Sequence, residues 1–334
     1  MNKIKIAQIG MGHDHATLIF KSLSKQNDIF DLVGYAVPQE EKDRFAKAYE
    51  CADGYRQMTV EEIMNDKSIV AVTVETEEVI LTKYAQMAAN NHKHIHMDKP
   101  GGTVLFDFEQ LINTVKANQL VFHIGYMYRY NTYVMELLDK VNKGELGEIY
   151  SVEAHMSCTH SIDKRNWLGN FKGGMLFFLG CHLIDIIYRI QGEPDEVVPL
   201  SCSTGIDNVT AEDFGMVVFK YKNGVSFAKA CAKEKGGFSR RQLVVCGSKK
   251  TIELKPLEWY TDVKKGLLYT LRSEKFTDNW CDMGVDTESQ PEDRYDKMMM
   301  SFAEMCRGEK KNSFSYDYEL SLYKLILKSC GVQF

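Results

Sequence analysis

The sequence predicts an α/β protein with a doubly wound parallel sheet in its N-terminal part and a second α/β domain with a large, mostly antiparallel sheet. Short apolar segments alternate with helical patterns over the first 125 residues, which is typical of a parallel sheet covered on both faces. A glycine turn, Gly10-Met11-Gly12, follows the first of these segments. After residue 196, short strand-like segments follow one another with only turns between them, which indicates an antiparallel meander.

The first part alternates strands with helices. Strands are expected at 4–9, 31–37, 69–74, 94–97 and 120–125, and helices at 16–26, 40–49, 79–90 and 106–118. Ligands bind at the carboxyl ends of the strands in such sheets. Gly12, Val37, Glu75 and Lys99 lie at these ends. We therefore expect a nucleotide-type site along this edge.

The second part begins with a helix and a strand and continues into the meander. Helices are expected at 133–143, 175–190, 293–306 and 318–328, and strands at 147–158, 197–203, 213–221, 225–232, 241–246, 251–254 and 267–271. We expect residues 1–125 to form a first domain around the parallel sheet and residues 126–334 to form a second domain.

Composition narrows the possible partners. The formal net charge is −5 and no long block of like charge occurs, which argues against nucleic acid and anionic membranes. No apolar run is long enough to span a bilayer, and no signal peptide is recognised. The nine cysteines are scattered without a C-x-x-C pair, so we expect reduced thiols and a cytoplasmic location.

The stretch Asn91–Pro100 ends in Asp98-Lys99-Pro100. Lysine is strongly hydrated, so the end of a buried strand is a costly place for it unless the site uses its charge. The alternative is a lysine in a surface turn. Because Lys99 falls on the binding edge, we favour a functional role.

Four motifs occur in order along the chain: Gly10-Met11-Gly12, Asp98-Lys99-Pro100, the segment from Gly125 to Asn131 (GYMYRYN), and the segment from Gly180 to Asp185 (GCHLID). Together they resemble the glucose–fructose oxidoreductase/inositol dehydrogenase/MocA-like family. The resemblance implies that residues 1–125 form a Rossmann dinucleotide-binding domain and that residues 126–334 form a substrate-binding and oligomerisation domain. It implies NAD or NADP as the cofactor, a sugar-like or polyol substrate, and a homodimer or homotetramer formed through the C-terminal sheet.

The resemblance also implies roles for individual residues. Lys99 corresponds to the lysine that contacts the nicotinamide ribose and the substrate hydroxyl, and His182 to the usual acid/base. A histidine that accepts the hydroxyl proton and a lysine that stabilises an alkoxide suit hydride removal from an alcohol. Substrate-binding residues are expected at Arg129, Asn131, His155, Trp167 and Asp185. Cofactor-binding residues are expected at Gly10, Met11, Gly12, His13, Val37, Thr76, Asp98 and Lys99.

Three of these residues have competing interpretations. His182 could instead be a satisfied core histidine. His155 could face solvent rather than the pocket. Trp167 could be a hydrophobic anchor for its loop rather than a stacking surface for sugar or nicotinamide.

The sequence departs from the family at four places. Phe178 stands where many family dehydrogenases carry an aspartate, four residues before the histidine. Val37-Pro38 ends a strand that usually ends in a ribose-binding acid. The segment 75–78 (ETEE) replaces a threonine-proline turn, and 12–15 (GHDH) replaces the glycine-rich start of the first helix. The choice between NAD and NADP therefore stays open.

Two other functions stay open for the same reason. One is a non-redox relative that senses a ligand or regulates. The other is a lyase or hydrolase that acts by transient oxidation with retained NAD.

The histidines suggest metal binding only weakly. His13-Asp14-His15 has no second cluster in the sequence that points back to it, and Asp14 is more simply a helix N-cap. His92, His94 and His96 alternate along a predicted strand, where surface histidines are equally common. We expect no metal site.

Overall fold

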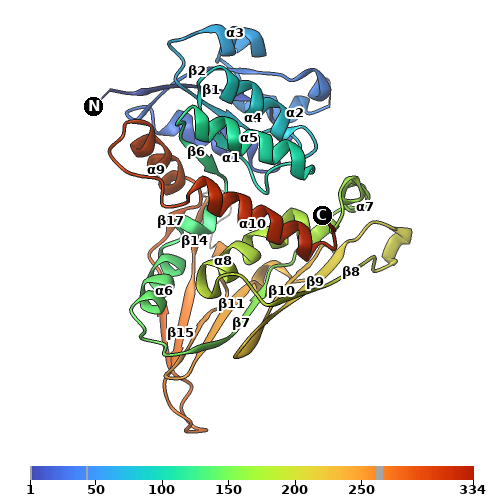
Figure 1. Cartoon of the computed structure of the whole chain (residues 1–334), viewed down its shortest axis with the longest axis vertical. Coiled ribbons are helices and arrows are strands. Elements are labelled where there is room, and N and C mark those ends of the chain that lie inside the picture. Colours follow the sequence, from blue (N-terminus) through green and yellow to red (C-terminus); the bar gives the residue numbers. More distant parts are fainter. Residues whose placement is uncertain (1, 43, 261–265) are drawn as a thin grey trace. The chain divides into compact units, whose positions relative to one another are not determined.

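The computed structural model describes residues 2–42, 44–260 and 266–334, and the chain forms two compact units (Figure 1). Unit 1 consists of Met1–Tyr126 and Tyr295–Tyr323. Unit 2 consists of Met127–Arg294 and Lys324–Phe334. Unit 1 thus includes a late segment of the chain that the expected first domain, 1–125, leaves out.

The core of unit 1 is a six-stranded parallel sheet in the order β3-β2-β1-β4-β5-β6. Its strands are β1 Ile4–Ile9, β2 Phe30–Ala36, β3 Gln57–Met58, β4 Ala71–Val74, β5 His94–Met97 and β6 Phe122–Ile124. Nearly every residue of β1, β4 and β5 is buried, as expected for strands covered on both faces. The order reverses between β1 and β4, so the loops after these strands frame the binding crevice of a Rossmann-type sheet.

Among the helices of unit 1, α4 lies against α5, and α1 lies against α9. The longer helices are α1 Ala16–Lys25, α3 Val60–Asn65, α4 Leu81–Asn90, α5 Leu105–Ala117 and α9 Asp296–Cys306. The last helix, α10 Tyr316–Ser329, contributes residues to both units. Thr59 starts α3 with a capping box: its hydroxyl accepts the Glu62 N–H, and the Glu62 carboxylate accepts the Thr59 N–H.

Three local expectations for unit 1 are wrong. The single helix over 40–49, of which residue 43 lies outside the described residues, is a 3₁₀ turn at Gln39–Glu41 and a short helix α2 at Ala46–Tyr49. Asp14 is not the N-cap of α1; that position is His15, without a side-chain cap. His92 lies before β5 with a φ of +56°, so it does not share a strand with His94.

The core of unit 2 is an eight-stranded sheet in the order β16-β15-β12-β11-β7-β10-β9-β8, in which only β7 and β10 pair in parallel. Its strands are β7 Ile149–His155, β8 Glu196–Cys202, β9 Phe214–Tyr221, β10 Gly224–Cys231, β11 Gln242–Gly247, β12 Thr251–Leu254, β15 Leu271–Lys275 and β16 Val285–Glu288. A small second sheet contains β13 Trp259–Tyr260, β14 Leu267–Tyr269 and β17 Glu292–Asp293. The predicted fold class is therefore confirmed.

Helix α8, Cys181–Gln191, contacts β7 and β10 and so covers one face of this sheet. It continues a π-helical turn over Leu176–Gly180, so the predicted helix over 175–190 changes character at its middle. The other helices of unit 2 are α6 Thr132–Asn142 and α7 Ile162–Trp167. The strand expected over 267–271 is wrong: Thr270 separates β14 from β15, which belong to different sheets.

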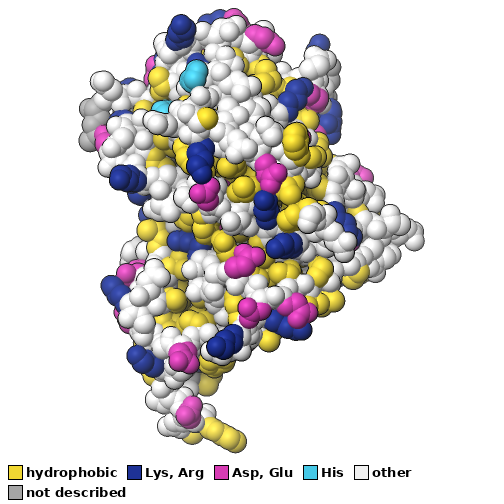
Figure 2. All heavy atoms as spheres, viewed as in Figure 1, with side chains coloured by type: hydrophobic (Ala, Val, Ile, Leu, Met, Phe, Trp, Pro, Cys, Tyr) yellow, Lys and Arg dark blue, Asp and Glu magenta, His cyan; other side chains and the backbone are white. Residues whose placement is uncertain are grey.

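Exposed apolar side chains occur on a hairpin of unit 2. The hairpin that joins β15 and β16 exposes Trp280 almost completely, together with Met283, and Figure 2 shows hydrophobic side chains at its far end. Among the described residues, no helix combines the length and the hydropathy needed to span a membrane.

Candidate functional site

Lys99 lies two residues after the end of β5 and is completely buried. The Asp98 carboxylate turns back on the chain, and its Oδ1 accepts the Lys99 backbone N–H at 2.7 Å. Lys99 therefore lies at the carboxyl edge of the sheet, next to the β1–β4 switch point. Its burial excludes the alternative of a lysine in a surface turn.

Buried carboxyl groups also lie at this edge, after β4 and β5. Glu75, Glu78 and Asp98 are each at most 1% exposed. Burial raises the pKa of Glu75 well above its ordinary value, and the Asp98 charge raises it further. Burial alone would also raise the pKa of Asp98, but His13 and His15 hold it well below its usual range. This edge thus combines a carboxyl group whose pKa is raised with one whose pKa is lowered.

A pair of buried histidines lies beneath the edge. His96 Nδ1 is 2.7 Å from His123 Nδ1, and His96 Nε2 is 3.5 Å from Glu75 Oε1. Both rings pack against Phe302 of α9. Burial lowers the pKa of His96 to about 4, so this ring is neutral near neutral pH.

The glycine loop after β1 closes tightly on the loop after β4. Gly10 has a φ of +84°, and a Cβ there would lie 2.5 Å from Thr76 Cγ2, so only glycine fits. The loop amides are already occupied: the Glu41 carboxylate accepts the N–H groups of Met11 at 2.8 Å, Gly12 at 3.2 Å and Glu77 at 3.1 Å. Burial raises the pKa of Glu41. In this sheet family such amides approach a pyrophosphate.

A cavity of about 420 Å³ opens beside the ends of β2 and β3. Val37 lines it, together with Gln39, Gln57, Met58, Thr59, Val60, Glu61, Lys83, Tyr84 and Met87. Glu40 binds both Lys83, at 2.5 Å, and the Tyr84 hydroxyl, at 2.6 Å. The Glu40–Lys83 pair therefore places charged groups of both signs at the cavity edge.

In unit 2, His182 lies in the first turn of α8 and is 1% exposed. The Tyr128 ring meets it edge to face, with centroids 5.3 Å apart. One turn along the helix, Asp185 forms a buried bidentate ion pair with Arg129, at 3.0 Å from Nε and 2.8 Å from Nη2. The pair fixes the segment that carries Tyr128 against α8, as a positioning contact for His182.

A second buried charge cluster lies behind Tyr128. The Glu258 carboxylate binds both Arg241 and Arg294, and Arg241 Nη1 is 3.5 Å from the Tyr128 hydroxyl. Burial would raise the pKa of Glu258, but the two arginines lower it to about 2. Burial also raises the pKa of the Tyr128 hydroxyl well above its ordinary value.

Asn131 is used by the fold. Its Oδ1 accepts the Val134 N–H at 3.0 Å and caps α6, and its Nδ2 donates to Thr270 Oγ1 at 3.1 Å. His155 also has protein partners: Nε2 lies 2.8 Å from Ser157 Oγ and 3.2 Å from Glu234 Oε2. It is 5% exposed, so it does not face solvent.

Trp167 ends α7 and packs against Phe178, the residue that replaces the family aspartate. The two rings are T-shaped with centroids 5.5 Å apart, and Lys164 Nζ lies 3.6 Å from the Trp167 centroid and 4.5 Å from that of Phe178. An aromatic pair with a cation over it thus stands in place of a carboxylate.

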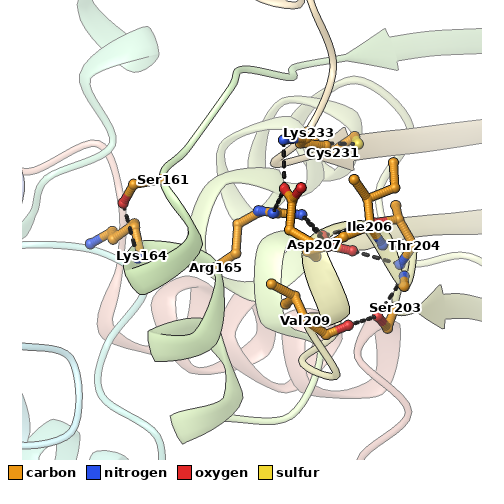
Figure 3. Close-up of polar contacts among 12 residues, drawn as sticks. Ser161, Lys164, Arg165, Ser203, Thr204, Ile206, Asp207, Val209, Cys231 and Lys233 are labelled. Atoms are coloured by element: carbon orange, nitrogen blue, oxygen red, sulfur yellow. Dashed lines mark hydrogen bonds and ion pairs between the residues drawn. The ribbon is translucent and has the colours of Figure 1, made fainter.

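Arg165 anchors α7. It is fully buried and binds Asp207, the Ile206 carbonyl at 3.1 Å and Asp213 at 3.0 Å. Lys233 approaches the same Asp207 at 2.7 Å (Figure 3). This network fixes the helix that carries Trp167, so the tryptophan stands on a rigid support.

Two family models match the chain. "Oxidoreductase family, NAD-binding Rossmann fold" matches residues 4–126, and "GFO/IDH/MocA C-terminal domain" matches residues 134–253. Both matches agree with the fold seen in the corresponding unit.

The known proteins that are similar to the chain include a dehydrogenase, an uncharacterized oxidoreductase and a sugar dehydrogenase of known structure. The chain is 26% identical over 267 residues to glucose-6-phosphate 3-dehydrogenase of Bacillus subtilis, and this alignment covers 74% of the chain and 73% of that enzyme. It is 24% identical to the uncharacterized oxidoreductase C26H5.09c of Schizosaccharomyces pombe, where the match spans only 45% of that protein. The structure of a levoglucosan dehydrogenase complex with NADH and levoglucosan superimposes with a TM-score of 0.77 at 17% identity, covering 99% of this chain and 98% of that one.

Several expected site residues gather within each unit. In unit 1 the structure brings Asp98 and His13 together beside Lys99, and Gly10 against Thr76. In unit 2 it groups His182, Asp185 and Arg129. Glu41 and Glu258 were missed, because neither belongs to a motif and only the fold reveals their partners.

Proposed function

The chain belongs to the Gfo/Idh/MocA oxidoreductase family, and from that premise we propose that it transfers a hydride between NAD or NADP and a hydroxyl-bearing carbon of a sugar-like or polyol substrate. The carrying observation is Lys99: a fully buried ammonium at the carboxyl end of a strand in a Rossmann-ordered sheet. A buried lysine is costly unless its charge has a use. B. subtilis glucose-6-phosphate 3-dehydrogenase and levoglucosan dehydrogenase support the substrate class.

The residues would divide the work as follows. The nicotinamide, when bound, accepts or returns the hydride. Lys99 would stabilise the alkoxide that develops at the substrate oxygen. His182 would take the hydroxyl proton during oxidation and return it during reduction. The Arg129–Asp185 ion pair would keep the His182 helix in place rather than contact substrate.

The dinucleotide would lie along the carboxyl edge of the unit 1 sheet. The cavity bordered by Val37 offers space for the adenosine end. The amides of Met11 and Gly12 would face the pyrophosphate once Glu41 gives way. NAD and NADP both remain candidates, because a carboxylate and a lysine, Glu40 and Lys83, meet at this cavity.

Cofactor titration is the first test. We expect NADH or NADPH to bind with an affinity better than about 1 mM, the upper end of ordinary enzyme affinities, and to change the intrinsic fluorescence. Wild type with NAD⁺ or NADP⁺ should then oxidise at least one member of a panel of sugars, sugar phosphates and inositols. If neither reduced cofactor binds, the proposal fails.

The two alternatives have their own signatures. A non-redox sensor would bind a ligand without turnover, and the similarity to known dehydrogenases does not favour it. A lyase or hydrolase that oxidises transiently would release NAD only on denaturation. Extracting the denatured protein and measuring the nucleotide by absorbance separates this case from an ordinary dehydrogenase.

We also propose that the protein forms a homodimer or homotetramer through the large sheet of unit 2. Leu200 on β8 and Val225 on β10 are each 50% exposed, and large apolar side chains on a sheet face favour association. Light scattering after size-exclusion chromatography checks the mass, and a monomer at micromolar concentration would contradict the proposal.

A cytoplasmic location remains a prediction.

A further inference from the structure

Two imidazoles and a carboxylate converge where the loop after β1 meets the end of β5. His13 and His15 stand immediately before α1, and Asp98 follows β5. One ligand-type atom from each residue lies within 4.8 Å of the other two. We call these three residues the 13/15/98 cluster. Strand order explains the convergence, because β4 alone separates β1 from β5 and all three strands run in the same direction.

Two separations within the 13/15/98 cluster are close to the edges of a metal coordination shell. Asp98 Oδ2 lies 2.9 Å from His13 Nδ1 and 3.2 Å from His15 Nδ1. Ligand bonds of about 2.0–2.1 Å to a tetrahedral zinc place neighbouring ligand atoms about 3.3 Å apart. An ion could therefore enter with only a small outward movement of these groups.

Carboxylates approach both nitrogens of the His13 ring. Nδ1 lies 2.9 Å from Asp98 Oδ2, and Nε2 faces Glu78 Oε1 at 3.2 Å. Metal-binding histidines usually have a carboxylate beside the ring nitrogen that does not bind the metal. Without an ion, burial lowers the pKa of His13, but Asp98 and Glu78 raise it to about 9, so a proton holds the position that an ion would take.

The cluster is buried and converges on one oxygen atom. Asp98 is 1% exposed, and the Nδ1 atoms of His13 and His15 both approach its Oδ2. Glu78 faces His13 from the other side of the ring. A divalent cation would fit this geometry and would replace a proton as the positive centre.

We propose that His13, His15 and Asp98 bind a divalent transition-metal ion such as Zn²⁺, with Glu78 as the outer partner of His13. Two imidazoles and a carboxylate suit first-row transition metals better than Mg²⁺ or Ca²⁺, which prefer all-oxygen sites. The competing occupant is a proton shared among His13, Asp98 and Glu75. This metal site does not depend on the proposed dehydrogenase activity.

Direct metal binding tests the proposal. Wild-type protein is stripped with EDTA, exchanged into chelator-free buffer and titrated with Zn²⁺ against a chromophoric chelator. Co²⁺ in a parallel sample reports ligation through its visible absorption band. We expect one equivalent of Zn²⁺ to bind and an absorption band that shows nitrogen coordination. A wild type that binds no zinc, with the shared proton alone in the cluster, would overturn the proposal.

Variants locate the ion. His13→Gln and His15→Asn should weaken zinc binding more than the roughly 10–100-fold that loss of an outer-shell partner costs, and Glu78→Gln should fall within that range. His15 is the safer variant, because its side chain is 13% exposed. His92→Asn is the matched control: His92 is exposed and has a φ of +56°, which Asn tolerates.

Two further measurements, the thermal stability of each variant and NADH binding by metal-free wild type, separate loss of the metal site from unfolding and from loss of cofactor binding. Each metal-free variant is first melted to confirm that it folds; if His13→Gln does not, His15→Asn decides. Zinc binding by both histidine variants as tight as wild type would contradict the site. NADH titration of metal-free wild type is measured separately, so failure of the metal site and failure of the proposed function produce different results.

Discussion

The Glu41 carboxylate accepts the backbone N–H of Met11 at 2.8 Å and that of Gly12 at 3.2 Å. An acidic side chain thus occupies the amides that a Rossmann-type loop normally offers to a phosphate. The Tyr49 hydroxyl donates to the same carboxylate at 3.0 Å. A dinucleotide pyrophosphate would therefore have to displace Glu41 or lie beside its charge.

Replacement of Glu41 by Gln tests this competition. Repulsion between charges about 4 Å apart is worth several kcal/mol at the dielectric typical near a protein surface, so removing one charge should tighten NADH or NADPH binding at least about tenfold, or 1.4 kcal/mol. Fluorescence titration measures it, with exposed Glu50→Gln as control. Weaker binding by Glu41→Gln would show instead that Glu41 holds the cofactor directly.

Substitution of Lys99 by Met tests its catalytic role. Loss of one group that stabilises a developing oxyanion costs about 10²–10³ in kcat, so turnover should fall by that factor with a smaller change in cofactor affinity. Lys93→Met is a matched control, since Lys93 is buried at the opposite end of β5, where it donates to the carbonyls of Asp66 and Ile69.

Steady-state kinetics of the two lysine variants settles the matter. The Lys93 variant should lose stability but keep its kcat. Equal losses of kcat in both variants would mean that Lys99 only supports the fold.

Removal of either partner from the Arg129–Asp185 ion pair should destabilise unit 2. Each side chain is 1% exposed, and breaking one side of a buried pair costs about 3–5 kcal/mol, because the other charge stays buried alone. Urea unfolding of Arg129→Met and Asp185→Leu should show this loss. The double variant should lose less than the sum, and simple additivity would argue against a direct pair.

Acid should weaken unit 2 through Glu258. Its pKa is lowered from 4.5 to about 2 in the folded protein, so its ionised form stabilises the fold above pH 4.5, and this stability disappears as pH falls from 4.5 through 2. At about 1.4 kcal/mol per pKa unit, the effect is roughly 3 kcal/mol.

Urea midpoints recorded from pH 6 downward check the Glu258 effect. Glu258→Gln should be less stable than wild type at neutral pH and should lose less further stability in acid. Glu253→Gln, on the partly exposed strand β12, is the control. If the stability of Glu258→Gln falls with pH as much as that of wild type, Glu258 is not the group that weakens unit 2 in acid.

Most of the fold could be predicted because its patterns are local. Strand β1 and the other buried parallel strands are continuous apolar runs, and these segments fall where the sequence places them. The interruption of the helix expected over 40–49 could not be predicted from the sequence. The segment has residues that favour a helix, but the Glu41 carboxylate forms tertiary hydrogen bonds with the glycine loop. Intrinsic helix propensity is overridden where hydrogen bonds to a distant segment stabilise another conformation more strongly.

The site was predictable only in part for the same reason. Lys99 and His182 belong to short motifs and could be named directly. The third member of the 13/15/98 cluster is more than eighty residues from the other two, and only the order of the strands brings Asp98 back to His13. Contacts between distant segments of this kind leave no local signal in a single sequence.

Unit 1 is built from two segments that lie far apart in the chain, which affects how it folds during translation. Its sheet appears early in the chain, but Phe302 of α9 packs against His96 and His123, and Asp296 binds Ser22 at 2.8 Å. Nascent chains generally fold from the N-terminus as they emerge. This unit, however, must wait for its last helices, so ribosome-bound intermediates should expose the α9 side of the sheet, and expression of residues 1–126 alone should yield an aggregation-prone fragment unless 295–323 is supplied.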